Sequence, residues 1–130
     1  MNGQYPTWRK SRRFLAYLAA LLYVVAGTMH FLSPAPFVRI VPRWIPWPEL
    51  AVSISGAAEI LGGLGLTVPR VRRLAAWGLV ALLVAVFPAN VYMATNPVEA
   101  GAAGINPLYL WFRLPVQGLL IWWLLWCSKA

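Results

Sequence analysis

The stretch LAAWGLVALLVAVFPANVYMA, residues 74–94, has no charged side chain and decides the fold class. At a rise of about 1.5 Å per residue, a helix of this length reaches across the roughly 30 Å hydrocarbon core of a bilayer. The stretch therefore predicts a transmembrane helix. Pro88 lies inside it and should kink the helix or end it early, because proline has no backbone N–H.

Three further apolar runs have a similar length and occupy residues 14–32, 49–67 and 107–127. The first run exceeds the apolar core of about 7–15 residues in a signal peptide, so we expect it to stay uncleaved. Composition agrees, because 11% of the residues are charged, against roughly 25% in soluble domains. The predicted divisions are a basic segment at 1–13, an all-α integral membrane domain at 14–127 and a short tail at 128–130.

The connection at residues 33–50 differs from the others because it contains five prolines, which no continuous helix tolerates. It is mainly apolar, but the charged side chains of Arg39 and Arg43 require that one side be in contact with water. We therefore expect an interfacial segment with one helical turn between the first two spans. The other connections are short, which favours a four-helix bundle with up-down-up-down topology.

The net charge of +8 reflects basic residues placed between the apolar runs. One predicted side carries two of them, Arg39 and Arg43, and Arg113 lies within a span. The other side carries Arg9, Lys10, Arg12, Arg13, Arg70, Arg72, Arg73 and Lys129. The positive-inside rule then predicts that both termini lie in the cytoplasm. Nucleic-acid binding is not expected, because the chain lacks the polar face that such binding needs.

Glu59 is one of only three acidic residues and lies inside the second span. A carboxylate in hydrocarbon costs at least ~2.5–3.5 kcal/mol, so such a residue usually faces other helices and finds a partner. Ser55 and the glycines at 62 and 63 recur on its face at helical spacing. Glu59 is therefore expected to point into protein, on a face where another helix approaches closely.

Polar residues in the other spans predict what faces Glu59. The fourth span carries a stripe of Asn106, Tyr109, Arg113 and Gln117. The rise of a helix places Glu59 ~15 Å and Arg113 ~9 Å below the outer ends of their spans. Two extended side chains can bridge this difference in depth. The first span ends near His30, at only ~3 Å, which reaches Glu59 directly only if the span boundaries shift.

A polar cavity open toward the outer face follows from these depths, with Glu59 at its floor. The candidate ligand-binding residues are Glu59, Arg113, Asn90, His30, Ser55, Tyr109 and Gln117. Each also has a structural explanation. A Glu59–Arg113 pair would fix helix register, Arg113 would snorkel to lipid headgroups, and Asn90 would satisfy a carbonyl freed by Pro88.

Several site chemistries have no support in the chain. A metal site is not expected, because His30 is the one histidine and has no cysteine or Glu-x-x-His pair beside it. A Ser-His-Asp arrangement is impossible without aspartate. Cys127 is the one cysteine, so the chain performs no dithiol chemistry by itself.

Three segments together resemble the DoxX-like family of small four-helix bacterial membrane proteins: AGTMHFLSP (26–34), VPRWIPWPELAVSISGAAEILGGLGL (41–66) and VAVFPANVYMA (84–94). The residues that carry the resemblance are His30, Ser55, Gly56, Glu59, Pro88, Ala89 and Asn90. The resemblance implies a redox-linked membrane subunit, since relatives accompany thiosulfate–quinone oxidoreduction and oxidative-stress complexes. Relatives that serve thiol–disulfide systems use paired cysteines, which this chain lacks.

Three functions remain open from the sequence. The leading hypothesis is a small-ligand- or quinone-binding subunit of a redox system, non-catalytic by itself and part of an oxidoreductase. The second is a structural or assembly partner that docks a membrane or periplasmic-side protein. The third is a small transporter, which four helices would form only as a homo-oligomer. In every case the lipid bilayer is the first partner.

Overall fold

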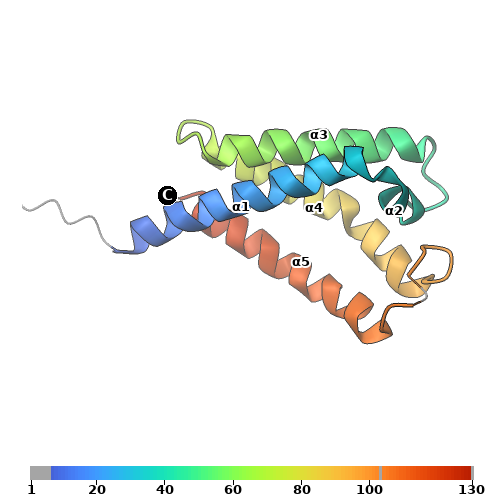
Figure 1. The fold of residues 1–130 in the computed structure, drawn as a ribbon. Helices are drawn as coiled ribbons and strands as arrows, with labels where there is room; N and C mark the ends of the chain where they lie inside the picture. Colours follow the sequence, from blue (N-terminus) through green and yellow to red (C-terminus); the bar gives the residue numbers. More distant parts are fainter. Residues whose placement is uncertain (1–6, 103, 130) are drawn as a thin grey trace, which may run out of the picture.

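The computed structural model describes residues 7–102 and 104–129, which form four long helices and one short one (Figure 1). The helices are α1 (Thr7–Leu32), α2 (Pro34–Arg39), α3 (Pro48–Leu66), α4 (Arg72–Thr95) and α5 (Pro107–Cys127). The four long helices are each long and apolar enough to cross a membrane. The prediction of an all-α membrane fold with four spans is therefore confirmed. Figure 1 shows the chain reversing direction between consecutive long helices.

The helix boundaries match the predicted spans except at the start of α1, which begins at Thr7 instead of residue 14. Lysine and arginine are good helix formers, so the basic residues continue the helix instead of forming a separate segment. At 26 residues α1 is longer than the hydrocarbon core requires. Residues 1–6 and 130 lie outside the described part of the chain.

Pro88 lies inside α4, which continues to Thr95, so of the two expected effects, a kink or an early end, the early end does not occur. A proline removes one N–H from the helix ladder and crowds the carbonyl of the preceding turn. Gln117 of α5 donates its side-chain amide to the backbone carbonyl of Leu83, which adjoins Val84, the residue whose carbonyl Pro88 leaves without a helical N–H. A neighbouring helix thus contributes to the hydrogen bonding beside the proline, as membrane proteins commonly arrange.

Glycines bring α1 and α3 into backbone contact, the most extensive packing between any two helices. A Cβ atom on Gly27 would lie 2.6 Å from the carbonyl oxygen of Gly56. A Cβ atom on Gly56 would lie 2.8 Å from the Cβ of His30. Only residues without a side chain allow this approach, which is how helices pack where lipid supplies no hydrophobic driving force.

The α2 end of the bundle is closed by contacts between the α2–α3 connection and the α4–α5 connection. Arg43 Nη2 lies 3.4 Å from Glu99 Oε2, and the Tyr92 hydroxyl donates to the same oxygen at 3.0 Å. The Arg39 side chain packs over Gly101, whose φ of +73° favours glycine. Arg39 and Arg43 therefore join this part of the chain to the α4–α5 connection.

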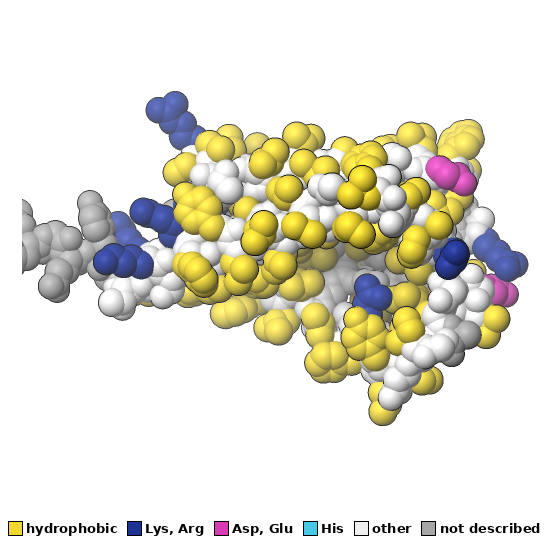
Figure 2. Space-filling view, viewed as in Figure 1, with side chains coloured by type: hydrophobic (Ala, Val, Ile, Leu, Met, Phe, Trp, Pro, Cys, Tyr) yellow, Lys and Arg dark blue, Asp and Glu magenta, His cyan; other side chains and the backbone are white. Residues whose placement is uncertain are grey.

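Side chains on the surface divide the molecule into a middle and two ends (Figure 2). Hydrophobic side chains cover the middle of the molecule, while most of the basic side chains lie toward its two ends. Large apolar residues are exposed on every long helix, among them Leu21, Leu61, Val84 and Leu119. Such a surface fits lipid as its solvent, which supports membrane insertion and contact with the bilayer.

The glycine contact predicts opposite effects of the same substitution at two positions. Gly27→Ala places a methyl group against a backbone oxygen that cannot move aside, so it should lower stability by about 1–3 kcal/mol. Gly78→Ala is the matched control, because no atom lies within 4 Å of its new Cβ. It should raise stability by up to about 1 kcal/mol through helix propensity. Thermal unfolding in detergent measures both, and equal effects would contradict the packing.

Candidate functional site

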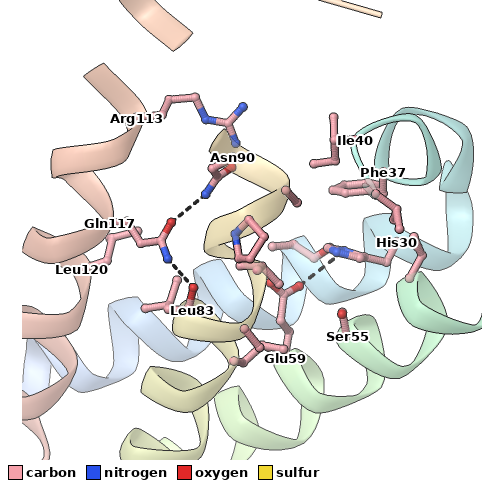
Figure 3. A pocket seen from close by; sticks show the side chains of 18 of the residues that line it. His30, Phe37, Ile40, Ser55, Glu59, Leu83, Asn90, Arg113, Gln117 and Leu120 are labelled. Carbon is pink, nitrogen blue, oxygen red and sulfur yellow. Dashed lines mark hydrogen bonds and ion pairs between the residues drawn. The ribbon is translucent and has the colours of Figure 1, made fainter. Parts of the chain in front are cut away.

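A cavity of about 650 Å³ lies between the four long helices and the α2–α3 connection. Its walls are mainly apolar, with polar groups reaching in from every long helix (Figure 3). The cavity is lined by all seven candidate residues from the sequence: His30, Ser55, Glu59, Asn90, Tyr109, Arg113 and Gln117. The structure thus brings these residues together around one space. Their role in binding stays a prediction.

Glu59 lies beside His30 of α1, not beside Arg113. Glu59 Oε2 is 3.3 Å from His30 Nδ1, at the distance of an ion pair. The same Nδ1 lies 2.7 Å from the backbone carbonyl of Ala26, which can only accept, so Nδ1 carries a proton and donates it there. Glu59 Oε2 consequently has no hydrogen-bond partner among the described residues, although it is enclosed by protein.

The expected Glu59–Arg113 pair is not formed, and helix register explains the difference. The depth estimate assumed that the outer ends of all spans lie at one level. Instead, the contact of Gly27 with Gly56 places the last turn of α1 beside the middle of α3. His30 therefore reaches Glu59 even though it lies close to the end of its own helix.

Arg113 occupies the other side of the cavity and has only weak partners. Its Nη1 lies 3.5 Å from Met93 Sδ, and its guanidinium carbon lies 6.0 Å from the centre of the Tyr109 ring. Within the described residues it forms no salt bridge. The half-buried guanidinium therefore keeps donors that a bound molecule could use.

A chain of side-chain hydrogen bonds joins α4 to α5 along one wall. Asn90 Nδ2 donates to Gln117 Oε1 at 2.7 Å, and Gln117 Nε2 donates to the Leu83 carbonyl. Gln117 is buried, so its amide meets its needs within the protein. The expectation that Asn90 serves the carbonyl freed by Pro88 is wrong, because the Asn90 side chain donates to Gln117 instead of to a backbone carbonyl. Asn106 is not part of the site, because its side chain caps α5 by accepting from Leu108 N.

Two further cavity residues contact or share a helix face with His30 and were not among the candidates drawn from the sequence. Tyr23 shares a helix face with His30, and its hydroxyl is buried without a hydrogen-bond partner in the described part of the chain. Phe37 of α2 stacks on the His30 ring at a centroid distance of 3.9 Å. Helical spacing in α1 could have identified Tyr23. Phe37 could not be found, because the path of a proline-rich connection leaves no periodic signal.

No metal centre is built into the cavity as described. Among residues 7–102 and 104–129, no group of three His, Cys, Asp or Glu side chains could hold a metal ion. Cys127 is buried at the opposite end of the bundle, where its thiol donates to the Leu124 carbonyl. The arrangement offers hydrogen bonds and charge in an apolar slot, which suits binding and positioning of a ligand.

The hydrogen-bond chain predicts a measurable coupling between α4 and α5. Gln117→Leu leaves Asn90 and the Leu83 carbonyl without their partner, so it should cost about 1–3 kcal/mol. Asn90→Leu should cost less once Gln117→Leu is present, with a coupling of about 0.6 to 1.7 kcal/mol, as for side-chain bonds in membranes. Unfolding of the two single variants and the double variant in detergent gives this energy. Strictly additive effects would contradict the contact.

Comparison with known proteins places the chain in one family. The sequence profile of a family described as a domain of unknown function, DUF8561, matches residues 18–128. None of the curated proteins and none of the solved structures compared with the chain matches it. The matched range holds every candidate residue of the cavity. The chain therefore belongs to the DUF8561 family.

Proposed function

We propose that this protein binds a small amphipathic ligand of the quinone class in its cavity, as a non-catalytic membrane subunit of a redox system. One observation carries the proposal: polar groups from all four long helices converge on a single, mainly apolar cavity. Ligand sites are typically of this kind, with volumes of about 300–1,000 Å³ and a few polar groups that fix orientation.

The chemistry of the lining fits a ring that carries two oxygens. Apolar residues such as Leu83, Val86 and Phe112 offer surface to the ring and its tail. Arg113 supplies donors on one side, and Glu59 with His30 supplies polar groups on the other. A ligand placed between them would meet hydrogen-bonding groups at both ends and apolar walls between.

The resemblance to DoxX-like proteins supports the same assignment. Its motif residues His30, Ser55, Glu59 and Asn90 come from three helices, and all four line the cavity. Residues that are scattered in the sequence but share one space are more readily explained by a common ligand than by separate packing roles. The redox association of the resembled family then favours a quinone over other amphipathic molecules.

We further propose that the protein resides in a bacterial inner membrane with both termini in the cytoplasm. The basic residues at the end of the bundle that holds the α3–α4 turn support this orientation (Figure 1). A periplasm-active reporter should be active when inserted in the α4–α5 connection and inactive when fused after Lys129. A fluorescent protein that folds only in the cytoplasm should give the opposite result. The reverse pattern of activities would overturn the orientation.

Blocking the cavity tests the binding function directly. Val86 lines the cavity, so Val86→Trp should fill it and lower the affinity for a short-chain quinone at least about tenfold, by steric exclusion. Val84 lies on the same helix but is 61% exposed, so Val84→Trp is the matched control and should bind normally. Quenching of tryptophan fluorescence in lipid nanodiscs measures binding. Equal affinity of the Val86 variant and the unmodified protein would reject the cavity as the site.

A docking role without a ligand makes a different prediction. If the bundle only bound a partner protein, the polar lining of the cavity would serve helix packing, and the purified protein would not bind quinone. The exposed apolar residues do not favour this alternative, because contact with lipid explains them equally well.

A further inference from the structure

Glu59 presents hydrogen-bond acceptors at its side of the cavity. The Glu59 carboxylate receives no hydrogen bond from any described residue, although a carboxylate can accept several. The one short hydrogen bond of the His30 ring goes from Nδ1 to the Ala26 carbonyl and not to Glu59. The Glu59 carboxylate therefore keeps acceptor capacity that faces the cavity.

Arg113 presents the opposite character on its side of the cavity. A guanidinium has five N–H donors and no acceptor, and the recorded partners of Arg113 are a thioether sulfur and an aromatic ring. Figure 3 shows Arg113 on α5, well apart from Glu59 and His30. A complementary headgroup must accept hydrogen bonds at one end and donate one at the other.

From this asymmetry we infer that the cavity selects the reduced, quinol form of its ligand over the oxidised quinone. The two forms have nearly the same shape, but both oxygens of a quinone only accept, whereas each quinol oxygen also carries a hydrogen. A quinol donates one hydroxyl to the Glu59 carboxylate and accepts from Arg113 with its other oxygen. A quinone accepts hydrogen bonds from Arg113 with one oxygen, but its other carbonyl oxygen then faces the Glu59 carboxylate. Both of these groups only accept hydrogen bonds, so no bond forms between them. This inference rests on the proposed function, since it concerns the same ligand in the same cavity.

Binding of matched ligands under anaerobic conditions tests the selection. The purified full chain in lipid nanodiscs is titrated with a decyl-substituted benzoquinone and with the corresponding quinol. A hydrogen bond to a charged group is the only added contact, so the quinol should bind at least about tenfold more tightly. In a second pair, 4-decylphenol and its methyl ether, a methyl group replaces the hydroxyl hydrogen, and neither compound forms a quinone–quinol couple. The phenol should bind more tightly by a similar factor.

Glu59→Gln supplies the decisive variant. A carboxamide both accepts and donates, so it serves a quinone carbonyl as well as a quinol hydroxyl, and the preference should fall to within about twofold. Glu49→Gln is the matched control, because Glu49 lies exposed in the first turn of α3, outside the cavity. It should keep the full preference for the quinol.

The outcomes separate the inference from the proposed function. Equal affinity of the unmodified protein for quinone and quinol, or tighter binding of the quinone, overturns the inference and leaves the binding function standing. A quinol preference that persists in Glu59→Gln also overturns it, because the donor would then be recognised elsewhere. Binding of neither form, with a correctly folded protein by circular dichroism, overturns both.

Discussion

The close approach of α1 and α3 at Gly27 and Gly56 is the constraint on which the rest of the structure depends. Each glycine faces the backbone of the other helix, so the register of the two helices is fixed to within a turn. That register places His30 next to Glu59. Without it, the carboxylate would lie in the apolar part of the bundle without its ion-pair partner, at a cost in free energy.

Polar groups inside this bundle are satisfied in two different ways. Between α4 and α5, Asn90 and Gln117 use each other and the Leu83 carbonyl, so this wall is complete within the protein. Glu59 and Arg113 instead keep unused hydrogen-bonding capacity that faces the cavity from opposite sides. The hydrogen-bonded wall of α4 and α5 thus stands next to two groups, Glu59 and Arg113, that could bind a ligand. A binding site built on rigid helices is expected to have this arrangement.

The sequence predicted the helices and the residues of the cavity, but not how those residues pair. Uninterrupted apolar runs identify spans because a bilayer admits little else, and polar residues within them face protein for the same reason. Pairing depends on how far one helix slides along another, which the glycine contact of α1 with α3 decides. The sequence contains these glycines but does not show which helix each one contacts. The predicted partner of Glu59 was therefore Arg113, whereas the structure has His30 in that position. The path of Phe37 over the His30 ring was equally out of reach, because it follows from tertiary packing of a proline-rich connection.

The separation of His30 from Glu59 in lipid tests the register most directly. His30 is the one histidine in the chain, so ¹⁵N-labelled histidine gives a single residue's signals in solid-state NMR. With ¹³C-labelled glutamate carboxyl groups, dipolar recoupling should show Nδ1 within the ion-pair distance of a carboxylate, in agreement with the 3.3 Å contact. A His30 signal that couples to no glutamate, together with a guanidinium signal of Arg113 that does, would contradict the account.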